Sequence, residues 1–489
     1  MPASPLIQLV AIGQVDQYLS LTPQLSYFKY VYKRHTRFAL DNLKLNFDGK
    51  SPELSKNTHR CTIKIPRHGD LLTNTCLVLS MPDIYSNDDL RFRWIENFGT
   101  LLIKQADIFV GSLGRSLNPI YGEWMLIWNE LTLSPSKLHK YNQITGNTSD
   151  YLNPRLANSQ IVIKKNNQIE YAYYPSSNKE TSNTPSIRSK LISIPLQFYF
   201  SKNPSLAIPL CALQTSEVII TIDIESVEKL YQIYDKDYIN NDGSLGKYIS
   251  SSFYNSKYNT DINIKTFTKR TDLNAYIEAQ YVYLNEIERK LITVNRRNNI
   301  FLIENIYKKD IEIAEITKNI ELDLSVPVKE LVWTLKRRDY ANFNLNTTYT
   351  DNNNHIMSTC KILWNKSNER VEEKDHIFFG KIQPYQHHSS IPKDGIYCYS
   401  FALYPEKWQP SGYYNPGGKF PINTLIQIGI NEEFKNNIDY EVTVYAIQYN
   451  RKAESQGEKK RGPDGPAGRR GFNNVKHQAL ATTFLIKTL

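Results

Sequence analysis

The feature of the sequence that most constrains its fold is a strict alternation of apolar and polar residues in short runs. Clear examples are the segments 61–65 (CTIKI), 220–225 (ITIDIE) and 440–444 (YEVTV). On a β-strand, such a run turns its apolar side chains to one face and its polar side chains to the other. Segments rich in Gly, Pro, Asn, Asp and Ser, such as 67–74 (RHGDLLTN), separate the runs at short intervals and are typical of turns. The sequence therefore predicts an all-β fold of antiparallel strands.

Length and composition indicate how many such domains to expect. The chain has 489 residues, of which 33 are Tyr and only 21 are Gly. This balance suits half-buried strands better than helix bundles or phosphate-binding loops. Length alone suggests about three domains, but all-β domains commonly contain about 200 to 250 residues, so two large β domains fit as well.

One segment departs from the strand pattern. In NPIYGEWMLIWNELTLS (118–134), apolar residues recur at helical spacing after Pro119. These residues are Tyr121, Trp124, Trp128 and Leu131. We predict a short amphipathic helix whose tryptophan pair packs under a sheet as part of the core.

The positive charge is concentrated towards the end of the sequence. The net charge is +10, and residues 451–477 contain eight basic and three acidic residues, which is half of that surplus. The rest is dispersed, as on a solvated surface. We interpret 451–477, which also contains Gly and Pro, as a mobile basic insertion. Phosphate binding through it is the alternative, but we expect no specific nucleic-acid partner.

The cysteines and the apolar segments indicate a cellular compartment. The five cysteines lack CxxC spacing and, being odd in number, cannot all pair within one chain, so we expect them to be reduced. They are Cys61, Cys76, Cys211, Cys360 and Cys398. The first basic residue is Lys29, which argues against a secretory signal, and no apolar run approaches the ~20 residues of a membrane span. We expect a soluble protein or a part of a soluble assembly.

No motif in the sequence indicates catalysis, a cofactor or a metal. The motifs GxGxxG, GxSxG, HExxH and GxxxxGK[ST] are all absent. His387 and His388 are adjacent, and adjacent residues on a strand point to opposite faces, so the pair makes a poor metal site. We therefore expect no catalytic, cofactor-binding or metal-binding residues, and no enzyme activity.

Three N-x-[S/T] sequons, at Asn147, Asn346 and Asn365, are formal candidates for glycosylation. In an Asn-rich chain without a recognisable signal peptide, we interpret them as chance matches.

Several segments, in order along the chain, resemble one family: the major capsid proteins of nucleocytoplasmic large DNA viruses. The N-terminal segment 6–40 resembles the family's arm, aromatic strand and following basic segment, and 67–82 resembles its Gly-Asp-Leu strand. Segment 120–133 resembles its Tyr-Gly-x-Trp helix, and 399–415 its Ser-Phe-Ala and Gln-Pro-Ser-Gly motif. The motif residues, to which the resemblance gives structural roles, are Phe28, Arg34, Thr36, Phe38, Gly69, Asp70, Trp124, Trp128, Pro410 and Gly412.

The resemblance implies a double jelly roll, that is, two tandem eight-stranded antiparallel jelly rolls with short helices in loops. We expect an N-terminal arm at 1–26, a first roll at 27–225, a linker or insertion at 226–271 and a second roll at 272–489. Within these boundaries, residues 25–40 would form the first strand of the first roll, and 276–291 would begin the second roll. Residues 478–489 would either supply the last strand or dock on a neighbour, and we favour the strand, because a roll without it exposes an edge.

The function that the resemblance implies is that of a structural major capsid protein. It would form homotrimeric, pseudo-hexagonal capsomers of an icosahedral virion after synthesis in the host cytoplasm. Its partners would be its own copies, neighbouring capsomers, minor capsid proteins and, for the basic insertion, an internal membrane surface. The alternatives are a minor or penton-associated capsid paralogue and a carbohydrate- or receptor-binding jelly roll.

Overall fold

The computed structural model describes most of the chain, which divides into two units, Met1–Ala39 and Leu40–Leu489. The described residues are 3–23, 27, 34–111, 116–154, 162–163, 169–170, 174–213, 216–240, 244–294, 300–365, 368–418, 421–434 and 438–453. No helix among them is long and apolar enough to cross a membrane.

The first unit contains two short helices, α1 (Ala3–Val10) and α2 (Gln14–Ser20). The backbone N–H of Gly13 donates to the Asp16 carboxylate at 3.0 Å and so caps the start of α2. Every side chain from residue 6 to residue 23 is exposed. The helices of this unit therefore bury no core of their own.

The first part of the second unit forms a jelly roll of two facing sheets. One sheet has the order β1-β14-β3-β10, with β9 also paired to β3, and the other has the order β2-β11-β5-β6. The strands are β1 (Phe38–Asn46), β2 (His59–Ile65), β3 (Leu71–Ser80), β5 (Ile103–Val110), β6 (Ile120–Tyr121), β9 (Leu191–Pro195), β10 (Ile208–Pro209), β11 (Val218–Ile224) and β14 (Tyr276–Leu284).

Eight later strands of the second unit form another jelly roll with the same connectivity. Its sheets have the orders β15-β24-β17-β22 and β16-β23-β20-β21. In the first roll, β9 and β10 pair with successive parts of β3 and together take the place of one strand. If the strands of each roll are numbered along the chain on this basis, both rolls have the sheet orders 1-8-3-6 and 2-7-4-5, which confirms the predicted double jelly roll. The strands are β15 (Ile300–Ile313), β16 (Thr317–Leu322), β17 (Val328–Arg337), β20 (Met357–Trp364), β21 (Asn368–Asp375), β22 (Ile396–Ser400), β23 (Thr424–Ile430) and β24 (Tyr440–Ala453).

The elements outside the two rolls are short. Three hairpins or small sheets are formed by β4 (Phe92–Trp94) with β12 (Tyr231–Ile239) and β13 (Leu245–Ser250), by β7 (Val162–Ile163) with β8 (Ile169–Glu170), and by β18 (Thr350–Asp351) with β19 (Asn354–His355). The helices are α3 (Phe98–Leu101), α4 (Gly122–Thr132), α5 (Pro135–Ile144), α6 (Ser149–Leu152), α8 (Tyr199–Lys202), η1 (Pro204–Leu206), η2 (Val227–Lys229), α9 (Ser251–Tyr258), α10 (Ile264–Phe267), α11 (Glu286–Val294), η3 (Arg338–Phe343), η4 (Phe378–Ile382), α12 (Gln383–His387) and η5 (Glu432–Phe434).

The alternating runs lie where the sequence predicts strands. Ile220 pairs with Ile63 and Ile222 with Cys61 between β11 and β2. All four side chains are buried, with at most 1% of their surface exposed. The alternation therefore sets which face of each strand enters the core.

The predicted boundary between the rolls is wrong. Residues 276–284 were expected to open the second roll, but they form β14, which pairs antiparallel with β3, with Tyr276 opposite Val78. β14 is thus the eighth strand of the first roll, and α11 leads from it to the second. Alternation alone cannot show to which roll β14 belongs, because β14 pairs with β3, whose residues lie about 200 positions earlier in the chain.

The segment 226–271, expected to be a linker or an insertion, is an insertion within the first roll and does not link the two rolls. β12 pairs with β4, and Tyr231 stacks on Phe92 with ring centroids 4.9 Å apart. Ile233 and Phe267 are buried in the core of the first roll. The segment therefore extends that roll and contributes to its core.

The ends of the rolls differ from expectation as well. The first strand was predicted over 25–40, but β1 begins only at Phe38, residues 34–37 are not in a strand, and Phe28 lies outside the described residues. The second roll already has its eighth strand in β24, so 478–489 is not needed as the last strand. Residues 451–453 of the predicted insertion belong to β24, and the rest of that segment lies outside the described residues.

Candidate functional site between the two rolls

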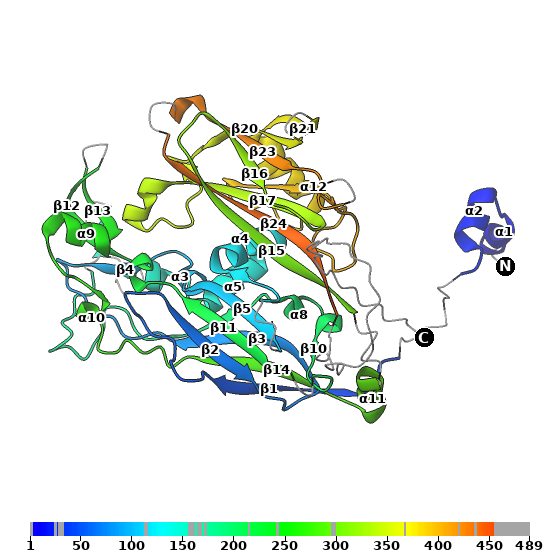
Figure 1. Ribbon diagram of the computed structural model, residues 1–489, viewed down its shortest axis with the longest axis horizontal. Coiled ribbons are helices and arrows are strands. Elements are labelled where there is room, and N and C mark those ends of the chain that lie inside the picture. Colours follow the sequence, from blue (N-terminus) through cyan, green and yellow to red (C-terminus); the bar gives the residue numbers. More distant parts are fainter. Residues whose placement is uncertain are drawn as a thin grey trace, which may run out of the picture. The chain divides into compact units, whose positions relative to one another are not determined.

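Helix α4 lies between the two rolls and joins them through an apolar face. Figure 1 shows it between the first roll and the sheet that contains β15 and β24. Trp124 and Trp128 stack with centroids 5.6 Å apart, and Trp124 contacts Tyr445 of β24 at 5.1 Å. This confirms the predicted helix and the packing of its tryptophans under a sheet. The buried cluster comprises Trp124, Ile127, Trp128, Leu131, Ile306, Val332, Tyr349, Ile396, Cys398, Tyr445 and Ile447.

Gly122 permits the close approach of α4 to the first roll. A Cβ atom at this position would lie 2.3 Å from the carbonyl oxygen of Ile103 and 2.5 Å from that of Thr100. Both oxygens belong to backbone that cannot move aside easily, so only glycine fits here.

Glu123, the next residue of α4, forms a partly buried polar link to the second roll. Its Oε1 lies 2.6 Å from Lys336 Nζ and accepts a hydrogen bond from Tyr349 at 3.1 Å. Its Oε2 accepts a hydrogen bond from the Tyr445 hydroxyl at 3.2 Å. Burial, together with the nearby carboxylate, raises the pKa of both tyrosines well above the ordinary value, so they remain donors.

A second charged link lies at Glu304 of β15. Glu304 pairs with Lys202 of the first roll at 3.1 Å and with Lys329 of β17. Burial alone would raise the pKa of Glu304, but the two lysines outweigh burial and lower it. Asn118 Nδ2 also donates to the Glu304 carbonyl at 2.7 Å. The carboxylate therefore binds one cation from each roll.

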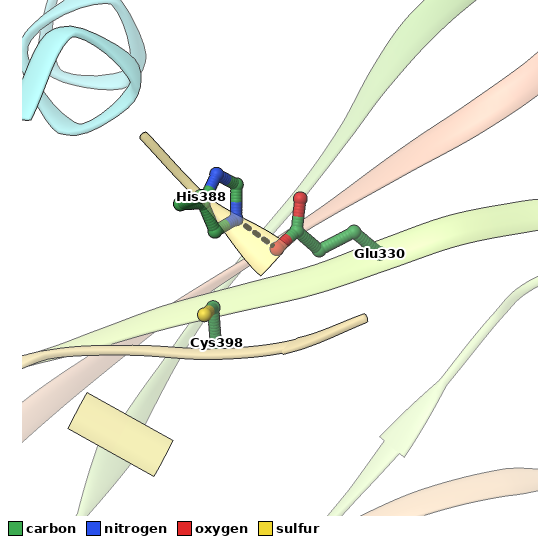
Figure 2. Close-up of side chains that lie close together, drawn as sticks. All are labelled: Glu330, His388 and Cys398. Carbon is green, nitrogen blue, oxygen red and sulfur yellow. Dashed lines mark hydrogen bonds and ion pairs between the residues drawn. The ribbon is translucent and has the colours of Figure 1, made fainter. Parts of the chain in front are cut away.

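A further charged group surrounds His388, which follows α12 in the second roll. Its Nε2 lies 2.6 Å from Glu330 Oε1, and its Nδ1 lies 3.1 Å from Glu406 Oε1. Burial disfavours the imidazolium, but Glu330 and Glu406 outweigh burial and raise the pKa of His388 to about 12. Cys398 completes the group, and burial raises its pKa to about 12. Figure 2 shows Glu330, His388 and Cys398 close together, and their ligating atoms lie within 4.8 Å of one another.

A further contact between the rolls joins residues 343–344 of the second roll to residues 228–232 of the first. Asn344 Nδ2 donates to the carbonyl oxygens of Glu228 and Tyr231, both at 2.7 Å. Gln232 Nε2 donates to the Phe343 carbonyl. The two rolls are thus held by hydrogen bonds and ion pairs as well as by the α4 cluster.

Asp70 of the predicted Gly69-Asp70 motif fixes the exit from the first roll. Its side chain binds Arg289 of α11, with Nε 2.8 Å from Oδ1, and its Oδ2 accepts the backbone N–H of Leu284 at 2.8 Å. Asp70 is 7% exposed. The motif therefore acts where β14 ends and α11 begins.

Replacing Asp70 with alanine is expected to destabilise the protein by about 1–3 kcal/mol, because the Leu284 N–H loses its acceptor. Amide hydrogen exchange should accelerate at 284–289, and the thermal midpoint should fall. Glu286→Ala is the matched control, because within the described part of the chain that exposed carboxylate pairs with Lys290 at i+4, a contact of about 0.5 kcal/mol or less. Equal effects of the two substitutions would contradict the role given to Asp70.

The other motif residues lie apart from this junction. Gly412 has φ 144°, and a Cβ there would lie 2.7 Å from the Phe401 carbonyl oxygen, so this loop requires glycine. Pro410 lies in the same exposed loop. In the first unit, Arg34, Thr36 and Phe38 are exposed.

The sequon asparagines take part in hydrogen bonds. Asn147 Nδ2 donates to Asn97 Oδ1 at 2.9 Å, and Asn346 Nδ2 donates to the Lys229 carbonyl at 3.1 Å. Asn365 is exposed, and its Oδ1 accepts the Asn423 N–H at 3.0 Å. Glycosylation at these positions stays a prediction. At Asn147 and Asn346, it would displace an existing hydrogen bond.

Sequence reasoning did not find the charged links at the junction. His387 ends α12 rather than lying on a strand, and only His388 joins the buried group. A signal was present in Lys329-Glu330, two charges at the start of the apolar strand β17. Both side chains are buried, at 1% and 0% exposed.

Comparison with known proteins gives consistent matches over nearly the whole chain. Residues 26–285 match the family described as "Major capsid protein N-terminus", and residues 288–451 match "Large eukaryotic DNA virus major capsid protein". The major capsid protein of Phaeocystis pouchetii virus is 27% identical over 92% of this chain and 97% of its own. That of Pyramimonas orientalis virus is 29% identical over 91% and 95%.

Solved structures agree on the fold. The Faustovirus major capsid protein superposes with a TM-score of 0.64 at 13% identity, over 91% of this chain and 94% of its own. A chain of the PBCV-1 virus capsid superposes with a TM-score of 0.60 at 20% identity, over 87% and 97%.

Proposed function

The chain belongs to the major capsid protein family of large eukaryotic DNA viruses, and we propose that it builds an icosahedral shell as a homotrimer. It is a structural protein of the virion capsid, in which copies associate as capsomers. The observation that supports the trimer is that two rolls with the same strand order pack together in one compact unit. Three such subunits present six similar wedges, which give a pseudo-hexagonal outline that can tile a surface.

Exposed apolar side chains outside the arm supply material for subunit contacts. They occur in α11, at Ile287, Leu291 and Val294, which are 58–79% exposed. They also occur in the family-motif loop, at Leu403, Tyr404, Trp408 and Tyr413. A permanent subunit interface commonly buries more than ~2,000 Å² and is apolar at its centre. We propose that these segments contribute to such interfaces.

We propose that the chain has no catalytic activity of its own. The charged side chains of the junction bind one another, as at Glu123, Glu304 and His388. We further propose synthesis in the host cytoplasm, where reduced thiols are stable, and none of the five cysteines forms a disulfide. Minor capsid proteins and an internal membrane surface are proposed as partners of the basic segment 451–477, and no specific nucleic acid.

The purified full-length chain is expected to have a solution mass of about 170 kDa, three times the 56.7 kDa of one chain. Light scattering coupled to size exclusion measures this mass directly, and negative-stain images should show hexagonal particles. A chain that stays monomeric at micromolar concentration would contradict the trimer while leaving the family assignment intact.

A further inference from the structure

The buried group around His388 has the composition of a metal site. We propose that Glu330, His388 and Cys398 form a zinc-binding site inside the second roll. Their ligating atoms lie within 4.8 Å of one another, and Glu330 and Cys398 are buried, whereas His388 is half-buried. The side chains of Glu330 and His388 are 0% exposed.

Strand register brings two of the ligands together. Val332 of β17 lies opposite Cys398 of β22, and Glu330 lies opposite Ser400. Glu330 is two residues from Val332, so Glu330 and Cys398 are diagonal neighbours on the same face of the sheet. His388 reaches this face from the segment after α12. The site therefore rests largely on a rigid sheet.

The donor types are those that zinc prefers. Zinc binds thiolate, imidazole and carboxylate ligands in tetrahedral geometry, at about 2.3 Å for sulfur and about 2.0 Å for nitrogen and oxygen. Magnesium and calcium would not select a thiol or an imidazole. A mixed set of one sulfur, one nitrogen and carboxylate oxygen therefore favours zinc.

Glu330 also offers an unused oxygen. Its Oε1 faces His388, but its Oε2 is buried and has no hydrogen-bond partner among the described residues. A buried carboxylate oxygen without a partner is costly. Zinc bound by both oxygens of Glu330 would satisfy it and would supply the fourth ligand atom.

Glu406 occupies the position of a residue that orients the histidine ligand. His388 Nδ1 lies 3.1 Å from Glu406 Oε1, which leaves Nε2 facing Glu330. The Ser389 N–H in turn donates to Glu406 Oε1 at 2.6 Å. Metal-bound histidines usually donate their other ring N–H to a carboxylate in this way.

Zinc would take the lone pairs of His388 Nε2 and Cys398 Sγ, and the protons displaced from these two atoms would pass to solvent.

The pair formed by His388 and Glu330 requires only a small adjustment. The present separation of 2.6 Å between His388 Nε2 and Glu330 Oε1 is that of a hydrogen bond. Two ligands of a tetrahedral zinc ion with bonds of about 2.0 Å stand roughly 3.3 Å apart. The imidazole would therefore withdraw by less than an ångström.

Zinc content provides the direct test. Untagged full-length protein, treated with a chelator, loaded with one equivalent of zinc and desalted, is expected to retain one zinc per chain by elemental analysis. Cys398→Ser and His388→Gln should each abolish retention, and Glu406→Gln should weaken zinc binding by about 10–100-fold. His387→Gln is the matched control and should retain zinc, because His387 contacts the Leu403 carbonyl instead of this group.

Cobalt gives a second readout that does not depend on how the variants fold. Wild-type protein loaded with Co²⁺ is expected to show a sulfur-to-cobalt charge-transfer band and the visible bands of tetrahedral cobalt, both lost on zinc addition. Absence of the charge-transfer band in wild type, or zinc retention by folded Cys398→Ser equal to that of wild type, would overturn the proposal. Either result would leave the trimer and the capsid role untouched.

Discussion

Replacing Trp124 with alanine is expected to lower the free energy of unfolding by about 3–5 kcal/mol, because it removes a buried indole from a packed cluster. Trp124 is 2% exposed and lies between Trp128 of its own helix and Tyr445 of the second roll. Beyond this loss, the cavity would weaken the contact between the rolls. We expect the wild-type second unit to unfold in one calorimetric transition and Trp124→Ala to unfold in two, one for each roll.

Two other tryptophans serve as controls at matched protein concentration. Trp333 is fully buried within the second roll, so Trp333→Ala should lower stability by a similar amount without separating the transitions. Trp408 is 42% exposed, so Trp408→Ala should have a much smaller effect on stability. An equal separation in Trp333→Ala, or an unchanged midpoint in Trp124→Ala, would contradict the role of α4 as the link between the rolls.

The local elements could be predicted because their signal is local. The alternation of Ile220 and Ile222 gives the buried face of β11, and the spacing of Trp124 and Trp128 gives the helix α4. Both patterns show which side of a helix or strand is apolar, and the side chains on that side are the ones that become buried. The resemblance to a known family supplied the overall connectivity, which the patterns alone do not contain.

The partner of each strand could not be predicted in the same way. β14 has the pattern of a strand in either roll, and only its pairing with β3 assigns it to the first. The segment that contains β12 is rich in polar residues, which concealed the buried Tyr231 and Ile233. Long-range pairing is decided by the three-dimensional competition between strands, which one sequence does not display.

The grouping of the buried charged residues was even harder to predict from the sequence than the pairing of the strands. Glu330 lies on β17, His388 follows α12 and Cys398 lies on β22. No sequence motif with a fixed spacing contains all three residues, so the sequence alone does not group them. The available signal was the pair of charges, Lys329 and Glu330, at the start of the largely apolar strand β17. A charge in such a strand requires a partner, but the sequence does not say which residue supplies it.

Deleting residues 1–26 is expected to spare folding and trimer formation but to prevent stable shell assembly. The described side chains of 6–23 are all exposed, so the deletion removes no buried contact within this part of the chain. Leu9, Val10 and Leu19 are 74%, 81% and 75% exposed. Large apolar side chains left in water within an oligomeric shell protein indicate contact with another subunit or a minor capsid protein.

The size of the assembly defect follows from the apolar surface of the arm. Burial of one Leu or Val side chain contributes about 1.5–3 kcal/mol, so losing a single such contact weakens an interface by roughly 10–150-fold. Because every subunit carries the arm, the loss is repeated throughout the shell. The amount of truncated chain that sediments with particles from co-expressing cells should therefore fall at least tenfold.

Point variants show whether the assembly defect comes from losing the apolar side chains of the arm or only from shortening the chain. Leu9→Ser with Leu19→Ser should reproduce the assembly defect, whereas Gln8→Ser with Gln17→Ser on the same helices should assemble normally. Solution mass and thermal midpoint should match wild type in all of them, because none of these side chains is buried in the structure. A truncated chain that fails to fold would place the arm in the core of the subunit, and normal particles from the leucine variant would show that its apolar surface has no partner in the shell.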